Sequence, residues 1–263
     1  MSETEAVPAV LTPAVLTEVD GNVLIVTINR PEARNAMNNA VAVGISEAMD
    51  RLDADIDLRC AILTGAGGTF CSGMDLKGFL RGESPSVPGR GFGSLSEWTP
   101  KKPIIAAVDG YALAGGMELA LACDLIIASS KAQFGIPEAK RGLAAAAGGL
   151  MKLPRQIPPR IAMELALTGD FITAARAYEL GFINVISEGP ALPAAKEMAA
   201  RIAQNGPMAL IASKAIIRES HEWTEAEMWE KQAKYTKPVL ASADAREGSA
   251  AFAEKRKPNW QGK

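Results

Sequence analysis

Two glutamates stand in segments where a charged side chain is unexpected. Glu118 lies within the apolar run GGMELALACD, and Glu138 follows Gly135-Ile136-Pro137 in a segment rich in turn-forming residues. Burying a carboxylate is costly unless it has a partner or a role. Either glutamate alone is explained most simply as a structural carboxylate with a satisfied partner. Together, and close to groups that stabilise an anion, two carboxylates can share proton transfers to and from a water molecule.

Two glycine-containing loops are candidates for the anion-stabilising groups. They span residues 70–76 (FCSGMDL) and 110–118 (GYALAGGME), and each follows an apolar segment. Glycine lets the backbone approach a ligand closely, and a helix N-terminus presents N–H groups without intrahelical partners. Such loops can stabilise negative charge that develops on an oxygen. The alternative is a pair of tight turns, because glycine most often marks backbone geometry.

Other catalytic classes lack their motifs in this sequence. Residues 65–70 (GAGGTF) miss the third glycine of a dinucleotide-binding loop, and no G-x-x-x-x-G-K-[ST] element occurs. Ser72 does not sit in a G-x-S-x-G elbow. The single histidine, His221, lies in a polar helical stretch and is expected at the surface. A dinucleotide enzyme, a nucleoside triphosphatase and a serine hydrolase are therefore disfavoured.

Composition narrows the class of protein further. The net charge of −2 argues against binding to duplex nucleic acid, and no apolar run approaches the roughly 20 residues of a membrane helix. Three cysteines lack metal-ligand spacing and indicate reduced thiols. Residues 1–15 are acidic, broken by prolines and unlike a signal peptide, so we expect a flexible leader. A cytoplasmic protein without metal, nucleic-acid or membrane binding is predicted.

The elements that must position these residues alternate between strands and helices. Residues 23–29 follow the turn signal Asp20-Gly21-Asn22 and predict the second strand of a hairpin. Asn38 is a candidate cap for a helix that runs to about Leu52. Further strands are expected at 61–64, 104–108 and 125–128, a helix at 115–123, and helices with one brief strand (182–186) after residue 140. This order indicates an α/β protein with mostly parallel pairing. Residues 81–98, rich in Gly, Pro and Ser, predict a mobile surface loop.

Taken in order along the chain, six segments resemble the crotonase family, the enoyl-CoA hydratases and isomerases. They are INRPEARNAM (28–37), AILTGAGGTFCSGMDL (61–76), KPIIAAVDGYALAGGMELALACDLIIAS (102–129), AQFGIPEAKRGL (132–143), LALTGDFITAARAYELGFIN (165–184) and AFAEKRKPNW (251–260). The resemblance implies a spiral of β-β-α turns over residues 16–200. It also implies a helical C-terminal region, 201–263, that builds a homotrimer or a hexamer.

The resemblance also implies roles for individual residues. The N–H groups of Met74 and Gly115 would form an oxyanion hole for the carbonyl of an acyl-CoA thioester. The CoA part of the substrate would lie beside Asp75, Leu76 and Lys77. The resemblance also places Arg34 near the nucleotide, and Phe252 and Lys255 against CoA at a subunit boundary, with the lysine facing phosphate. No cofactor is implied apart from CoA as part of the substrate.

The two glutamates decide between activities within this family. Hydratases carry one glutamate in a G-G-x-E-L helix and one in an F-G-x-P-E turn, and both are present here as Glu118 and Glu138. The resemblance therefore implies an enoyl-CoA hydratase of fatty acid metabolism, as in β-oxidation. Double-bond isomerisation, dehydration of a substituted acyl-CoA, or an RNA- or CoA-binding relative without turnover remain alternatives.

The segment after Glu138 departs from the usual hydratase pattern. Leu150 and Lys152 replace a threonine and an arginine, and residues 144–147 form a run of alanines. By the resemblance, this segment packs behind Glu138 and shapes the acyl pocket. Its small side chains, with the 81–98 loop, predict room for a bulky or branched acyl group.

Overall fold

The computed structural model describes residues 13–263. The first element of this part is a hairpin. Strands β1 (Val15–Asp20) and β2 (Val23–Ile28) are antiparallel, with Gly21 in the left-handed conformation at the turn. The predicted hairpin is confirmed. Of the expected leader, residues 1–12 lie outside the described residues, whereas Val15 already pairs with Ile28.

The main sheet continues from β2 in the order β1-β2-β3-β6-β8-β11, and its pairs beyond the hairpin are parallel. Its further strands are β3 (Cys60–Gly65), β6 (Ile104–Val108), β8 (Leu125–Ser129) and β11 (Val185–Ser187). Strands β3 and β6 are almost continuously apolar because helices cover both faces of the sheet. The sequence predicted each of these strands to within a few residues.

A smaller sheet, β10-β9-β7, stands beside the main one. Its strands are β7 (Tyr111–Leu113), β9 (Gln133–Gly135) and β10 (Ile172–Thr173), of which β7 and β9 are parallel. The polypeptide alternates between the sheets: β6 leads to β7, then β8 leads to β9. Helix α3 (Gly115–Ala122) follows β7 directly, so one turn of this spiral consists of a strand in each sheet and a helix.

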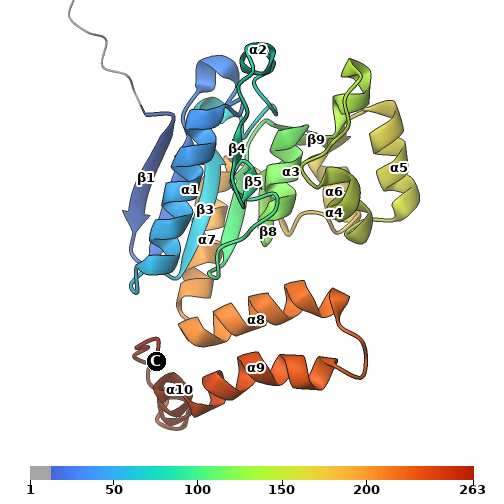
Figure 1. The fold of residues 1–263 in the computed structure, drawn as a ribbon. Coiled ribbons are helices and arrows are strands. Elements are labelled where there is room, and N and C mark those ends of the chain that lie inside the picture. Colours follow the sequence, from blue (N-terminus) through green and yellow to red (C-terminus); the bar gives the residue numbers. More distant parts are fainter. Residues whose placement is uncertain (1–12) are drawn as a thin grey trace, which may run out of the picture.

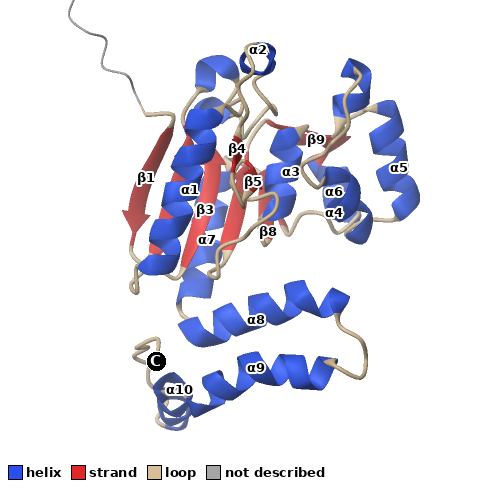
Figure 2. Cartoon of the chain, in the orientation of Figure 1, coloured by secondary structure: helices blue, strands red, loops and turns tan. Residues whose placement is uncertain are grey.

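Helices enclose the main sheet from both sides (Figure 2). Helix α1 (Asn39–Ala54) begins at Asn38, whose side chain accepts the Val41 N–H, as the sequence predicted. On the opposite face, α7 (Ala191–Ala203) packs alanines against β3 and β6. Small side chains let this helix approach the sheet closely.

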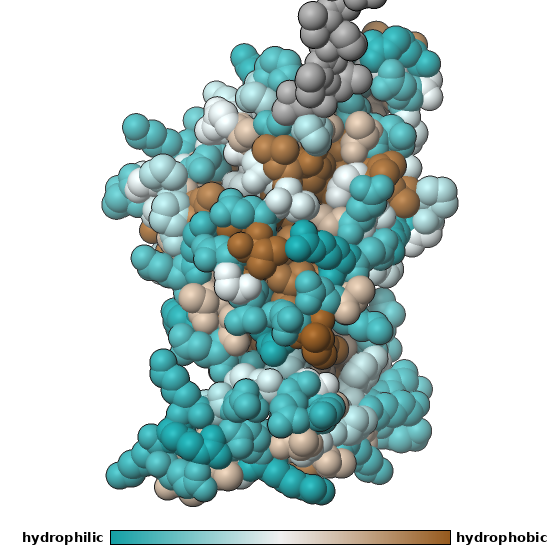
Figure 3. Space-filling model, turned by 90° about the vertical axis from the view of Figure 1, so that its left-hand side faces the viewer, coloured by the Kyte–Doolittle hydropathy of each residue, from teal (hydrophilic) through white to brown (hydrophobic). Residues whose placement is uncertain are grey.

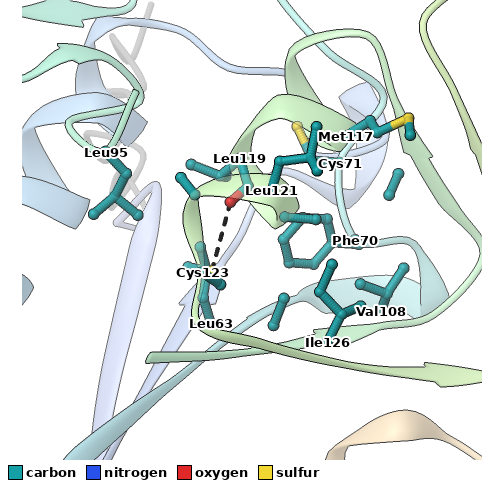
Figure 4. Packing of buried hydrophobic residues seen from close by; sticks show 14 of the residues in the cluster. Leu63, Phe70, Cys71, Leu95, Val108, Met117, Leu119, Leu121, Cys123 and Ile126 are labelled. Atoms are coloured by element: carbon teal, nitrogen blue, oxygen red, sulfur yellow. Dashed lines mark hydrogen bonds between the residues drawn. The ribbon is translucent and has the colours of Figure 1, made fainter. Parts of the chain in front are cut away.

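The larger hydrophobic core lies on the face of the main sheet that α1 and α3 cover. Figure 4 shows Phe70 lying among Met117, Val108 and Ile126, with the Cys123 thiol donating to Leu119 O at 3.5 Å. Phe70 is fully buried. The loop that carries the candidate oxyanion donor is therefore anchored at its first residue in the core.

Residues 81–98 are more ordered than the sequence predicted. After α2 (Leu76–Leu80), strands β4 (Ser86–Val87) and β5 (Gly91–Phe92) form a short hairpin. Leu95 is completely buried, and Arg90 pairs with Asp50 of α1. The prediction of a surface loop is wrong for residues 91–95, because Leu95 lies in the core and most of its polar, glycine-rich neighbours are buried with it.

Short helices follow the second sheet, and longer ones close the chain. They are α4 (Gly149–Lys152), α5 (Pro159–Thr168), α6 (Ala174–Glu179), α8 (Pro207–Glu219), α9 (Met228–Ala241) and α10 (Ala243–Ala253). The 3-10 turns are η1 (Pro31–Ala33), η2 (Ala66–Gly68), η3 (Pro137–Arg141), η4 (Leu153–Arg155) and η5 (Ser220–Glu222). Figure 1 shows α8, α9 and α10 below the sheets, joined to them through α7.

The surface beside β1 carries separate apolar patches among hydrophilic side chains (Figure 3). Two exposed residues of β1, Leu16 and Val19, contribute apolar surface of this kind. Within residues 13–263, no helix is both long and apolar enough to cross a membrane.

Candidate active site

The two glycine-containing loops meet through backbone hydrogen bonds. In the first loop, Cys71 N–H donates to Tyr111 O at 2.9 Å, and Leu113 N–H returns a bond to Cys71 O at 3.1 Å. Gly73 has φ +105°, and a methyl group placed on it would lie 2.9 Å from Ala114 Cβ. Glycine is required there because the second loop passes directly against it.

Met74 and Gly115 stand side by side as backbone donors. The same methyl position on Gly73 lies 3.5 Å from Gly115 N, which shows how closely the loops approach. Among the described residues, neither the Met74 N–H nor the Gly115 N–H donates a hydrogen bond to the protein. Gly115 is the first residue of α3, where an unpaired N–H is expected. Two free donors beside one cavity suit an oxygen that gains negative charge.

Ala114, directly before Gly115, has an unusual backbone conformation with φ 52° and ψ −127°. For a residue with a Cβ such a conformation costs about 1–3 kcal/mol. It is held by the Ala114 N–H, which donates to Gly135 O at 2.9 Å. The strained residue turns the chain from β7 into α3 and so sets the direction of the Gly115 N–H.

Glu118 is buried on the first turn of α3, with 4% of its surface exposed. Its Oε1 accepts the Gly149 N–H at 2.9 Å, from the start of α4. Burial raises the pKa of this carboxyl above its ordinary value, and hydrogen bonds from the Gly149 and Ala147 backbone and the charge of Lys152 only partly offset that rise. The carboxylate form therefore has both a donor and a nearby cation.

Glu138 has a different environment at the start of η3. Pro137 precedes it, and its side chain is 9% exposed. Its Oε2 is buried without a hydrogen-bond partner among the described residues. Burial, with a smaller contribution from the negative charge of Glu118, raises the pKa of Glu138 to about 7. Near neutral pH this group holds a proton for much of the time.

One cavity of about 900 Å³ joins these groups. Its lining includes Met74, Gly115, Glu118 and Glu138, so the four predicted central residues come together. A water molecule and an activated carbonyl placed here would meet two backbone donors, one carboxylate and one protonated carboxyl group. That set can add water across a double bond conjugated to the carbonyl.

The predicted CoA-binding residues of the N-terminal half line the same cavity. They are Arg34, Asp75, Leu76 and Lys77. The Asp75 carboxylate is engaged by Arg30 at 3.0 Å and caps α2 through the Lys77 and Gly78 N–H groups. The hydrogen bond from the Gly78 N–H, then the Arg30 guanidinium and the Lys77 N–H, hold the pKa of Asp75 below its usual range.

Phe252 and Lys255 lie elsewhere in this chain. Phe252 is 88% exposed and borders a separate cavity of about 490 Å³ with Trp260, between α8 and α10. Lys255 is exposed just after α10 and does not line the cavity that holds the glutamates. Contact of these residues with CoA at a subunit boundary stays a prediction.

Two residues that shape the site, Gly149 and Phe92, were not among those predicted from the sequence. The Gly149 N–H binds Glu118, and the Phe92 ring packs on Gly115, since a methyl group there would lie 2.4 Å from it. The pair Gly148-Gly149 after the alanine run was a signal for a close backbone approach. Phe92 gave no comparable signal, because it stood in a stretch expected to be mobile.

A second cavity, of about 470 Å³, lies behind Glu138. Glu138, Leu143 and Ala144 line both cavities, so the two adjoin. Apart from Glu138, its walls are apolar and several of their side chains are small: Ala139, Ala144, Ala145, Ala162 and Ala166. The predicted space next to the alanine run is present.

Comparison with known proteins agrees with this geometry. The family model described as enoyl-CoA hydratase/isomerase matches residues 18–263. The chain belongs to the enoyl-CoA hydratase/isomerase family. An enoyl-CoA hydratase of Mycobacterium tuberculosis is 45% identical, with 95% of this chain and 97% of the relative covered. A carnitinyl-CoA dehydratase of Proteus mirabilis is 41% identical, with 92% and 96% covered.

Solved structures of family members confirm the fold. A crystal structure of an enoyl-CoA hydratase from Mycobacterium tuberculosis, 57% identical in sequence, superposes with a TM-score of 0.94. The match covers 96% of this chain and 100% of that one. The predicted crotonase-like α/β spiral with a helical C-terminal region is therefore correct.

Proposed function

We propose that this family member is an enoyl-CoA hydratase, which adds water reversibly and syn to a trans-2-enoyl-CoA to give a 3-hydroxyacyl-CoA. One observation carries the proposal. Glu138 has a pKa of about 7, and its Oε2 finds no hydrogen-bond partner in residues 13–263. It shares a cavity with the hydrogen-bonded Glu118 and with two backbone N–H groups that donate to no other group of this described part. Hydration needs a base and an acid at the same time: the hydrogen-bonded Glu118 suits the base, and Glu138, whose pKa is raised to about 7, suits the acid.

The thioester oxygen accepts hydrogen bonds from Met74 N–H and Gly115 N–H in this mechanism. They draw electron density from the β-carbon and stabilise the enolate-like transition state. By analogy with other oxyanion holes, loss of one donor costs about 3–4 kcal/mol.

The two glutamates then move the protons. Glu118 accepts a proton from water as the water oxygen bonds to the β-carbon, and Glu138 gives its proton to the α-carbon. The proton on Glu118 returns to Glu138, directly or through solvent, before the next turnover. Dehydration of the 3-hydroxyacyl-CoA uses the same groups in reverse.

The second cavity supports acyl groups larger than crotonyl. It is apolar, adjoins the reaction site at Glu138 and has room beside its small alanine side chains. We therefore propose bulky or branched apolar acyl groups as substrates. Charged acyl groups would meet no compensating partner there other than Glu138.

Self-association into a trimer or hexamer is part of the same proposal. Trp229, Leu240 and Phe252 of α9 and α10 are each more than 70% exposed in the single chain, which is unfavourable unless they are covered. Light scattering after size-exclusion chromatography tests this. A monomer at micromolar concentration would refute it.

The activity is tested by following loss of the conjugated enoyl-thioester absorbance with enoyl-CoAs of increasing size. Glu118→Gln and Glu138→Gln should each lower kcat by orders of magnitude while substrate still binds. Glu47→Gln on the exposed face of α1 is the matched control and should be unchanged. Normal turnover in either active-site variant, or formation of a shifted double bond instead of a 3-hydroxy product, would contradict the proposal.

A further inference from the structure

Lys152 ends the short helix α4 on the side of Glu118. The helix begins after Gly148, and the stem of Lys152 folds back along that glycine: a methyl group on Gly148 would lie 3.2 Å from Lys152 Cε. The Nζ atom donates to Ser96 O at 2.9 Å. The side chain is half-buried, so its charge is partly removed from water.

The same turn of chain also holds Glu118. Gly149, three residues before Lys152, donates its N–H to Glu118 Oε1 at 2.9 Å. A methyl group on Gly149 would lie 3.1 Å from both Oε1 and Cγ of Glu118. The Glu118 carboxylate therefore packs on Gly149, and the stem of Lys152 packs on the adjacent Gly148.

The charges around this pair leave Lys152 as the cation that favours ionised Glu118. Among the described residues, Lys152 of α4 is the charged group that acts on Glu118, whereas Glu118 of α3 and Arg141 of η3 act on Glu138. Burial and the charge of Arg218 of α8 lower the pKa of Lys152, whereas Glu118 and the Cys123 thiol, directly after α3, raise it. Arg218 is engaged by Asp124 at 3.4 Å, whereas Lys152 forms no ion pair within 4 Å among the described residues.

The other end of the lysine reaches the segment after β5. Ser96 follows the fully buried Leu95, and its N–H donates to Phe92 O at 3.2 Å. Phe92 in turn packs on Gly115, one of the two free donors. A hydrogen bond to Ser96 O thus fixes the piece of chain that holds an aromatic ring on the oxyanion loop.

We propose that Lys152 is a positioning residue for the reaction: its ammonium compensates the buried negative charge of Glu118, and its hydrogen bond to Ser96 O anchors the Phe92 segment against Gly115. This inference rests on the proposed function, because it takes Glu118 as the base. It concerns a position where the sequence departs from its resemblance to hydratases, which place an arginine there.

The first experiment compares Lys152→Met, which keeps the apolar stem, with Lys152→Arg, which keeps the charge. Without the ammonium, ionised Glu118 is less favourable, so the acid limb of the kcat/KM profile should move up by about one pH unit in Lys152→Met. Its kcat should fall more than its KM rises. Lys152→Arg should restore the wild-type limb, and Lys131→Met, an exposed lysine, should leave it unchanged. An unmoved acid limb in Lys152→Met overturns the proposal.

A second experiment is independent of turnover. The effect of Lys152→Met on urea unfolding is measured in the wild-type and Glu118→Gln backgrounds, at pH 8 and pH 5 and equal protein concentration. The substitution should be more destabilising when Glu118 is present, and this excess should shrink at pH 5. Equal effects in both backgrounds overturn the role of Lys152. If the wild-type protein hydrates no enoyl-CoA, the proposed function fails, yet this cycle still decides whether Lys152 and Glu118 are coupled.

Discussion

Glu138→Gln should inactivate the protein, and its stability relative to wild type should rise with pH. A buried carboxyl whose pKa is raised opposes folding once it must ionise. Below the ordinary pKa of 4.5 the carboxyl is neutral in the folded and the unfolded chain, and its ionisation costs the fold no stability. As pH rises from there through about 7, the free energy of unfolding falls, because the unfolded chain ionises more readily than the folded one. Glutamine is neutral at every pH, so the variant should not show this pH-dependent loss of stability.

The size of the effect follows from the two pKa values. The difference between about 7 in the folded chain and 4.5 in the unfolded chain corresponds to about 3 kcal/mol at pH 8, since one unit is worth about 1.4 kcal/mol. At pH 5 the same linkage gives about 1 kcal/mol. Within residues 13–263 Glu138 Oε2 has no partner, and a glutamine amide left in the same way would cost about 1–3 kcal/mol. This cost is the same at both pH values and cancels in the comparison.

Urea unfolding followed by tryptophan fluorescence provides the measurement, with wild type, Glu138→Gln and the control Glu47→Gln at one protein concentration. The free energy of unfolding of Glu138→Gln, relative to wild type, should be about 2 kcal/mol higher at pH 8 than at pH 5. The control should show no such dependence. A stability difference that is equal at both pH values would refute the argument that burial holds a proton on Glu138.

Three further predictions concern the reaction. Hydration needs the proton on Glu138, so kcat/KM should fall as pH rises past about 7; a flat profile up to pH 9 would count against its role as acid. Gly149→Ala forces a methyl group to 3.1 Å from Glu118 Oε1 and should lower kcat about tenfold at similar KM, as steady-state kinetics will show. Ala166→Phe narrows the second cavity and should raise KM for branched enoyl-CoAs while sparing crotonyl-CoA; an equal effect on both would disprove that this cavity receives the acyl group.

The sequence predicted most of the scaffold because the signals were local. The Asn38 cap, the turn at Gly21 and the apolar runs of β3 and β6 each act within a few residues, and the structure places all of them as expected. The 81–98 segment failed for the opposite reason. Its order depends on Leu95 reaching the core and on Arg90 meeting Asp50 of α1, contacts that no local pattern encodes.

The site divides in the same way. The resemblance brought Met74, Gly115, Glu118 and Glu138 together, and they line one cavity. The different environments of the two carboxyls came only from the structure. They depend on the hydrogen bond from the Gly149 N–H to Glu118 and on the lack of a partner for Glu138 Oε2 in the part of the chain that the structure describes. The hydrogen bond to Glu118 comes from a residue 31 positions further along the chain. The spacing of the two glutamates therefore could not predict it.

The two donors beside the cavity belong to the main chain, and this has an evolutionary consequence. A codon change at Met74 alters the side chain but leaves its N–H in place, and only proline would remove it. The carboxyl groups of Glu118 and Glu138, by contrast, disappear with almost any substitution. A lineage with this architecture can therefore exchange the proposed proton-transfer groups in single mutational steps, while the backbone donors proposed to bind an acyl carbonyl are inherited unchanged.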